Sequence, residues 1–401
     1  MLPQDNNSDQ HRIILNLSFG AFIRDAGQYV IWVIMAVYLN EVRSLSYIEI
    51  GLVFLIAGIT SVPVSIAGGN LLDRMGRRKV AVLIPWIMCA ISLTLFVLVF
   101  SGSSIIPIVS LLIIAGPIQS LQQVTINSII SDVTAFSERI SGFSALRIAS
   151  NVGIGVGLVT GGLLSQINYS YVFLLAVAGY FVEGIIYYSG IPETSVRTSG
   201  KPDGTRVKAR FFVPYRDGFF ISMSVIISVT WFFTGMFESP LTPLYMSSVN
   251  HFSTFSITIL FAINTITVIL GQTPVNRLLR KVKDSSRIVL GLLVYALAYV
   301  IFAETSVYII LGLSVAILTL GENISAPASG SLITKIAPED KRGAYLGFNS
   351  SIDSLITPFR PIVGTVLLTA TVETPGLSWL TVAFISFGLA ITFFVVFRNR
   401  P

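Results

Sequence analysis

The sequence predicts an all-α polytopic membrane protein, with twelve transmembrane helices in two pseudo-symmetric six-helix bundles. Three observations predict this fold class. The chain is 53% hydrophobic and only 11% charged, whereas about 25% of the residues of a soluble domain are charged. The apolar residues come in runs of about 20, which is the length that a helix needs to cross a bilayer. The basic residues between the runs gather in alternate connections, as they do in multi-pass proteins.

The apolar runs define the helices in chain order. Their expected bounds are 12–39, 46–72, 79–101, 105–132, 141–167, 170–190, 217–247, 254–278, 287–303, 306–334, 343–370 and 377–397.

The positions of the 26 Lys and Arg residues predict the orientation of the chain. Nearly all of them fall in connections on one side, Arg43 lies on the other, and Arg24, Arg147 and Arg360 lie inside segments. Because Lys and Arg are enriched in cytoplasmic loops, we expect a plasma-membrane protein with both termini in the cytoplasm. The first ten residues have no basic region, so we expect segment 12–39 to be an anchor and not a cleaved signal peptide.

Several other classes of protein are excluded by composition. The single Cys89 cannot form an intramolecular disulfide or a cysteine metal site. His11 and His251 are too far apart in sequence for a histidine metal motif. There is no phosphate-binding P-loop motif, and the net charge of +6 follows from the loops. We therefore expect no enzyme activity, no cofactor, no metal and no nucleic-acid partner.

The chain reads as two halves. The longest polar stretch, 192–217, is predicted to be a cytoplasmic linker between a bundle at 1–191 and a bundle at 218–401. The sequence from Ser46 resembles the sequence from Ser253 at an offset of 207 residues. This internal repeat favours two equivalent six-helix halves, a layout seen in many secondary transporters.

The connection between the second and third segments reads GNLLDRMGRRK, from Gly69 to Lys79. We expect Gly69 to allow close helix packing and Gly76 to make a tight turn. The motif resembles the loop between the second and third helices of the major facilitator superfamily. Its residues of interest are Gly69, Asp73, Arg74, Gly76, Arg77 and Arg78.

The resemblance implies that this loop is a conformational latch. In the family its aspartate caps the eleventh helix, which begins near Gly343 here, and an arginine reaches an acid at the end of the fourth helix, Asp132 here. The alternative is that the arginines set the topology through their positive charge and bind anionic lipid.

The fifth segment contains GIGVGLVTGG, which begins at Gly153. This sequence resembles the glycine motif of antiporters in the same superfamily, with Leu158 in the place of the motif's proline. Its glycines are Gly153, Gly157, Gly161 and Gly162. The alternative is that these small residues only let two helices pack closely.

The tenth segment and the loop after it, from Gly321, resemble the pattern of twelve-helix drug exporters. The resemblance implies an exporter more than a sugar importer.

Ionisable side chains inside the segments are candidates for coupling transport to protons, because burial in a bilayer costs each about 2.5–3.5 kcal/mol on insertion scales. The candidates are Asp25, Glu322, Glu238 and Asp353, and the basic partners are Arg24, Arg147 and Arg360. Two alternatives are structural: Asp25 pairs with Arg24 or Arg147, and Asp353 pairs with Arg360. Glu183 is expected to lie near mid-depth against lipid-side neighbours or another helix, and it is not among the coupling candidates.

The resemblance implies that the first, fourth, seventh and tenth helices line a substrate cavity. The candidate cavity residues are Tyr29, Trp32, Gln119, Trp231 and Phe233, since aromatic rings suit lipophilic cations. Ordinary packing is the alternative for each of them. Pro240 and Pro243 predict a bend in the seventh helix.

These observations together predict a secondary active transporter that works by alternating access. We expect proton-coupled export of lipophilic, often cationic, drug-like compounds by a monomer in contact with membrane lipid. The alternative is a proton-coupled carrier of a defined metabolite, such as a sugar, an organic acid or an amino acid.

Overall fold

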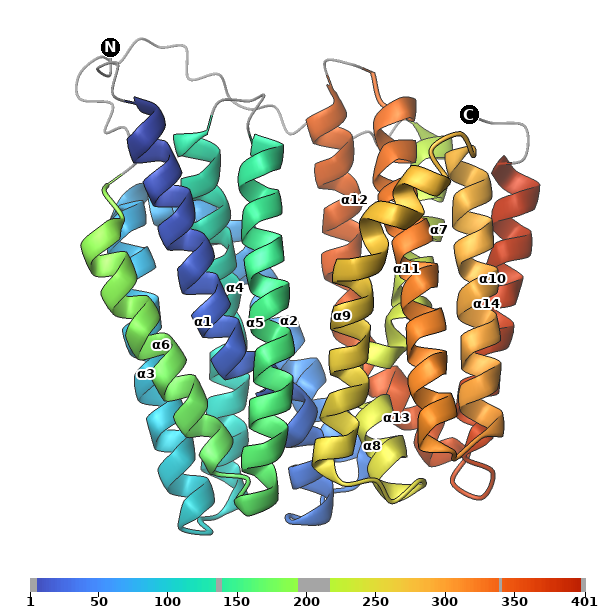
Figure 1. Ribbon diagram of the computed structural model, residues 1–401, viewed down its shortest axis with the longest axis horizontal. Coiled ribbons are helices and arrows are strands. Elements are labelled where there is room, and N and C mark those ends of the chain that lie inside the picture. Colours follow the sequence, from blue (N-terminus) through green and yellow to red (C-terminus); the bar gives the residue numbers. More distant parts are fainter. Residues whose placement is uncertain (1–5, 135–138, 194–216, 339–340, 398–401) are drawn as a thin grey trace. The chain divides into compact units, whose positions relative to one another are not determined.

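The computed structural model describes residues 6–134, 139–193, 217–338 and 341–397 (Figure 1). Within these ranges the only regular elements are helices, and twelve spans are long and apolar enough to cross a membrane. The predicted fold class is therefore confirmed. Apart from its ends, the predicted linker 192–217 lies outside the described residues.

The chain divides into two compact units. The first comprises Met1–Val196 and Met246–Thr265, and the second comprises Arg197–Tyr245 and Ile266–Pro401. The helices of the first unit are α1 (Asn6–Glu41), α2 (Tyr47–Met75), α3 (Arg77–Phe100), α4 (Ile105–Val133), α5 (Arg139–Ile167) and α6 (Tyr171–Gly190).

In the first unit, α1 lies between α5 and α6, its main packing partners (Figure 1). α2 packs on α4, and α3 packs on α6 and α4. As a result 67% of the most apolar window of α1 is buried, the largest share among the twelve spans. Most side chains near the middle of α1 therefore face protein and not lipid.

The second unit is built from interrupted and continuous helices. They are α7 (Gly218–Thr234), the 3₁₀ turn η1 (Gly235–Glu238), α8 (Leu241–Ser248), α9 (Thr254–Leu278), α10 (Asp284–Glu304), α11 (Tyr308–Ile336), α12 (Arg342–Ile356), the 3₁₀ turn η3 (Thr357–Phe359), α13 (Arg360–Ala370) and α14 (Gly376–Phe397). α10 packs on α11 and α14, and α7 packs on α12 and α14. The boundary between the units falls inside α8. Residues up to Tyr245 belong to the second unit, whereas Met246–Thr265, which include the start of α9, belong to the first.

The seventh span is interrupted, as Pro240 and Pro243 predict. α7 ends at Thr234, and α8 begins at Leu241 after the η1 turn. The hydroxyl of Ser239 accepts from the Leu241 N–H at 3.3 Å, a donor at the start of α8 that lacks a partner within that helix. It also donates to the Met236 carbonyl oxygen at 2.7 Å.

The eleventh span, predicted to be one helix over 343–370, is interrupted by η3 between α12 and α13. Pro358 lies in the turn, and Pro361 follows Arg360 at the start of α13. Each proline lacks the N–H that a continuous helix needs. The break is therefore a feature that the sequence analysis missed.

Two helix starts support the internal repeat. The Ser46 hydroxyl accepts a hydrogen bond from the Glu49 N–H at 3.3 Å, and the Glu49 carboxylate accepts one from the Ser46 N–H at 2.8 Å. This is a capping box at the start of α2. The Ser253 hydroxyl likewise accepts from the Ser256 N–H at 3.2 Å at the start of α9. Both serines are the first residues of the aligned segments.

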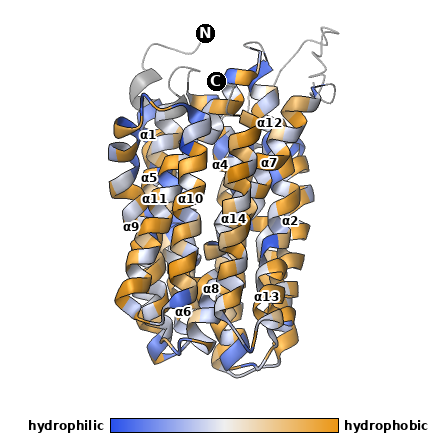
Figure 2. Cartoon of the chain, turned by 90° about the vertical axis from the view of Figure 1, so that its right-hand side faces the viewer, coloured by the Kyte–Doolittle hydropathy of each residue, from blue (hydrophilic) through white to orange (hydrophobic). Residues whose placement is uncertain are grey.

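The hydropathy of the surface suits a lipid environment. Figure 2 shows hydrophobic residues along the helices and hydrophilic ones concentrated toward their ends. Many large apolar side chains are exposed, among them Ile66, Ile106 and Ile309, each at least 74% exposed. A soluble protein rarely exposes so much contiguous apolar surface.

Candidate functional site

Glycines on α5 bring the backbone of α1 close. Gly153, Gly157 and Gly161 recur every fourth residue and so form one stripe on the helix. A β-carbon at Gly153 would overlap the Phe22 carbonyl oxygen, and one at Gly157 would overlap that of Ala26. This stripe is thus a packing surface for α1. It fixes α1 on either side of residues 24 and 25.

Arg24 and Asp25 on α1 form a buried ion pair. Arg24 Nε and Nη2 donate to the two carboxylate oxygens of Asp25 at 2.8 and 3.0 Å, and the two residues are only 6% and 5% exposed. Asp25 also accepts from Gln28 Nε2 at 3.2 Å and from the hydroxyl of Ser150 on α5. Of the two partners that the sequence allowed for Asp25, the structure selects Arg24. Arg147 is exposed on α5.

Glu183 on α6 completes the cluster from a second helix. Its Oε1 lies 3.5 Å from Arg24 Nη1, and its Oε2 accepts from Gln122 Nε2 of α4 at 2.8 Å. The residue is fully buried. We refer to Arg24, Asp25 and Glu183 as the carboxylate–arginine cluster.

The carboxylate–arginine cluster holds two carboxylates against one guanidinium. With all three groups ionised its net charge is −1, and an uncompensated buried charge is costly. A proton or a cationic ligand would remove that imbalance. The arrangement can therefore bind positive charge inside the first unit.

The first unit also contains three of the predicted cavity residues. Tyr29, Trp32 and Gln119 are half-buried. The Trp32 ring lies edge-on to Phe54, with centroids 5.3 Å apart. Gln119 forms a side-chain hydrogen bond with Tyr180, whose hydroxyl also donates to the Gln28 amide oxygen.

In the second unit, Arg360 pairs with Glu238. Arg360 Nη1 lies 3.6 Å from Glu238 Oε2, and Nη2 donates to the Trp231 carbonyl oxygen at 3.0 Å. That carbonyl lies in the last turn of α7, where a positive charge is favourable. A β-carbon at Gly235 would meet the guanidinium carbon at 2.5 Å, so the glycine makes room for the arginine.

The remaining candidates of this unit have other neighbours. Asp353 accepts a hydrogen bond from Asn349 Nδ2 at 2.9 Å, and it also interacts electrostatically with Arg360, which begins the helix after the η3 turn. Glu322 is half-buried on α11 and interacts electrostatically with Tyr295 of α10. Phe233 is half-buried, with its ring edge-on to a neighbouring phenylalanine.

The Gly69–Lys79 loop has a network of its own in the first unit. Arg77 forms an ion pair with Asp132 at the end of α4 and lies 3.7 Å from Asp73. Its N–H donates to Glu193 Oε1 at 3.0 Å. Gly76 adopts a φ of +89°, so the expected turn is present. Arg74 is exposed.

Gly69 and its neighbour Gly68 differ in their contacts within the first unit. A β-carbon at Gly69 would meet no described atom of the first unit within 4 Å, whereas one at Gly68 would lie 3.3 Å from Leu121 and Val124 of α4. The close packing with α4 therefore belongs to Gly68, because one residue along a helix turns the side chain by about 100°.

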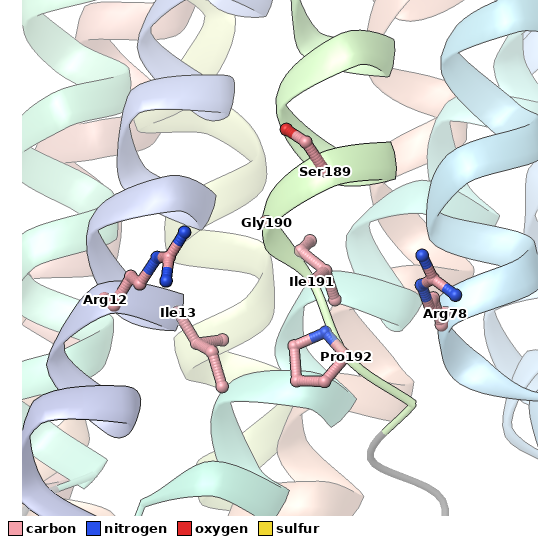
Figure 3. A pocket seen from close by; sticks show the side chains of 7 residues that line it. All are labelled: Arg12, Ile13, Arg78, Ser189, Gly190, Ile191 and Pro192. Atoms are coloured by element: carbon pink, nitrogen blue, oxygen red, sulfur yellow. The ribbon is translucent and has the colours of Figure 1, made fainter.

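Two cavities lie at the end of the first unit where this loop is found. One of about 330 Å³ is lined by Arg12 of α1, Arg78 of α3 and the Ser189–Pro192 end of α6 (Figure 3). The other, of about 410 Å³, is lined by Arg78, Lys79, Trp86, Glu193 and neighbouring apolar residues. None of the predicted cavity residues lines either of them.

Comparison with known proteins identifies relatives over most of the chain. The family model described as Major Facilitator Superfamily matches residues 17–355 and 239–401. The uncharacterized MFS-type transporter YttB of Bacillus subtilis is 26% identical over 367 residues, which cover 89% of this chain and 88% of that protein. A Na(+), Li(+), K(+)/H(+) antiporter of Planococcus maritimus is 24% identical over 84% of this chain and 86% of its own.

Solved structures share the fold. The peptide transporter POT in complex with sulfate has a TM-score of 0.77 at 18% identity, covering 97% of this chain and 94% of its own. The nucleoside transporter NupG has a TM-score of 0.73 at 15% identity, covering 96% and 99%. At these identities the likeness establishes the architecture alone.

Proposed function

The chain belongs to the Major Facilitator Superfamily, and from this premise we propose that it is a proton-coupled exporter of lipophilic, often cationic, drug-like compounds. Its relatives are named as transporters, and the similarity covers most of their length. Secondary transport is therefore the activity on which the proposal builds. The finer assignment concerns the charge of the substrate and the coupling ion.

The observation that carries the proposal is the charge of the carboxylate–arginine cluster. Two fully or nearly fully buried carboxylates face one guanidinium. Such a site attracts a cation or a proton and repels an organic anion, because like charges repel strongly where water is excluded. This supports cationic substrates over organic acids.

Coupling follows from competition for that negative charge. A proton bound to the cluster neutralises it, and a cationic substrate bound nearby in the same half does the same. If each favours a different access state, loading one promotes release of the other. Major facilitator proteins change access by rocking their two halves, so the proton gradient can drive export.

A second candidate function is the exchange of monovalent metal cations for protons. Two observations favour it: one relative is named as a Na(+), Li(+), K(+)/H(+) antiporter, and the net negative charge of the cluster attracts alkali cations to its vicinity as well as organic ones. A carrier of a defined metabolite, such as a sugar or an organic acid, remains the other alternative, and both kinds of compound are included in the transport test.

We further propose a multi-pass plasma-membrane location with both termini in the cytoplasm, on the evidence of the basic connections. The expected partners are a small-molecule substrate, protons and membrane lipid, with the protein acting as a monomer.

Proton flux in proteoliposomes tests the proposed function. A pH dye is trapped inside, and lipophilic cations, alkali cations, sugars and organic acids are added in turn, to wild type and to Asp25→Asn and Glu322→Gln. We expect proton movement with lipophilic cations that is lost in the Asp25 variant. Movement with Na⁺, Li⁺ or K⁺ alone would establish the second candidate, and movement with a sugar or an acid alone the metabolite carrier. No proton movement with any compound would overturn proton coupling.

A further inference from the structure

We infer that Glu183, and not Asp25, binds the exchangeable proton of the carboxylate–arginine cluster. This inference rests on the proposed proton coupling, and it names the side chain that binds the coupling proton. It also reverses the order expected from sequence, in which Asp25 was a coupling candidate and Glu183 was not.

The two carboxylates accept unequal numbers of hydrogen bonds. Asp25 accepts two from Arg24 and one each from Gln28 and Ser150. Hydrogen bonds donated to a carboxylate stabilise its charged form. Asp25 thus accepts four hydrogen bonds from three side chains.

Glu183 has fewer hydrogen bonds and a longer contact with Arg24 than Asp25 has. Its hydrogen-bond partners are Gln122, at 2.8 Å, and Tyr187, so it has two hydrogen bonds where Asp25 has four. Its distance of 3.5 Å to Arg24 is longer than either contact between Arg24 and Asp25. It is also the more deeply buried of the two acids, with no exposed surface. Burial disfavours the charged form of a carboxyl group. A single proton shared by the cluster therefore goes to Glu183.

The cluster has room for a proton but not for a larger cation. The Arg24 guanidinium already lies between the two carboxylates. A metal ion would have to displace it to reach both acids, whereas a proton adds to one oxygen and needs no space. With Glu183 protonated, Arg24 and Asp25 balance one another and the cluster is neutral.

The groups around Glu183 allow both protonation states. Glu183 interacts with Tyr180 and Tyr187 of its own helix, with Arg24 and Asp25 of α1, and with the amide of Gln122 of α4. The α5 hydroxyl of Ser150 binds Asp25. The α3 side chains that contact α6 are Trp86, beside Gly184, and Cys89, beside Val177. An amide is both a donor and an acceptor. Gln122 can donate to the carboxylate and, after rotating its amide, accept from the carboxylic acid.

Infrared spectroscopy tests the inference without any transport. The purified protein in nanodiscs is titrated while the carbonyl stretch of protonated carboxylic acids is followed, in wild type, Glu183→Gln, and Glu373→Gln as a control on an exposed loop acid. We expect a titrating band that is lost in Glu183→Gln and kept in Glu373→Gln. A band that persists unchanged in Glu183→Gln would overturn the inference.

A labelled wild-type sample guards against a variant that does not fold. Carboxyl-¹³C glutamate is expected to shift the band, and carboxyl-¹³C aspartate to leave it in place. A band that shifts only with labelled aspartate would assign the proton to Asp25 or another aspartate and overturn the inference.

Transport then separates this inference from the proposed function. In proteoliposomes we expect Glu183→Gln to lose substrate-driven proton movement and to retain downhill substrate movement. Full coupling in this variant would overturn the role of Glu183 alone. A wild type that moves no protons, but shows the glutamate band, would refute the proposed function and leave the proton on Glu183.

Discussion

Arg24 holds Asp25, its own neighbour in sequence, by two parallel hydrogen bonds at 2.8 and 3.0 Å. Adjacent residues of a helix point about 100° apart and do not ordinarily face each other. Here the long arginine side chain bends back to the aspartate while a third nitrogen, Nη1, approaches Glu183. One guanidinium thus links α1 to α6 across the interior of the first unit.

Replacing Arg24 by alanine should destabilise the protein strongly. The substitution leaves two buried carboxylates without their cation, and breaking a buried ion pair from one side typically costs about 3–5 kcal/mol. We expect a clearly lower thermal unfolding midpoint for the purified variant in detergent. Arg147→Ala, at an exposed position of α5, is the control and should change stability by less than about 0.5 kcal/mol. Equal midpoints for the two variants would contradict a structural role for Arg24.

Gly157→Ala should loosen the contact between α1 and α5. The new methyl group would overlap the Ala26 carbonyl oxygen, and overpacking of this kind typically costs about 1–3 kcal/mol. Gly155→Ala on the same helix is the matched control, because its β-carbon would meet Thr265 at an ordinary 3.6 Å. Thermal unfolding of both variants measures the difference. The packing role of Gly157 is refuted if Gly155→Ala is the less stable one.

The Arg77–Asp132 ion pair should show measurable coupling in a double-mutant cycle. Their side chains are 21% and 25% exposed, so solvent screens the pair and we expect a coupling free energy of about 1 kcal/mol or less. Arg77→Ala, Asp132→Ala and the double variant are compared by thermal unfolding. Arg74→Ala combined with Asp132→Ala is the control cycle, and additivity is expected there. Additive effects in the Arg77 cycle would mean that the pair contributes nothing.

Ser239→Ala should destabilise the break in the seventh span. The Ser239 hydroxyl donates to the Met236 carbonyl oxygen and accepts from the Leu241 N–H at 3.3 Å. Loss of a buried hydrogen bond typically costs about 1 kcal/mol, and more where a buried group is left unsatisfied. Ser222→Ala, on the exposed side of α7, should be close to neutral. Unfolding midpoints that do not differ would show that the break needs no support from the hydroxyl.

The two helix breaks show how far proline predicts structure here. Pro240 and Pro358 lie at interruptions. Five other prolines lie inside helices that continue, namely Pro63, Pro85, Pro117, Pro274 and Pro327. Because neighbouring groups can satisfy the carbonyl that a proline leaves open, the residue alone does not decide whether the helix stops. The bend at Pro240 was predicted and the break at Pro358 was missed for this reason.

Glu183 shows the corresponding limit for the site. A carboxylate near the middle of an apolar segment is a functional candidate on sequence grounds alone, and that signal was present. The sequence could not show that Glu183 of α6 and Gln122 of α4 face Arg24 of α1. Those residues are 61 and more positions apart, and their meeting depends on how three helices are rotated about their axes.

The sequence by itself determined the class of the protein and the number of its spans, and its loop motif implied that an arginine reaches Asp132. The structure identifies that arginine as Arg77. Helices are required because a backbone in lipid must satisfy its own hydrogen bonds, and the apolar runs give their lengths. Only the tertiary structure decided which acids Arg24 holds. Glycines at positions 153 and 157 let α1 approach α5 closely, and this packing sets the rotation that turns Arg24 and Asp25 toward Glu183.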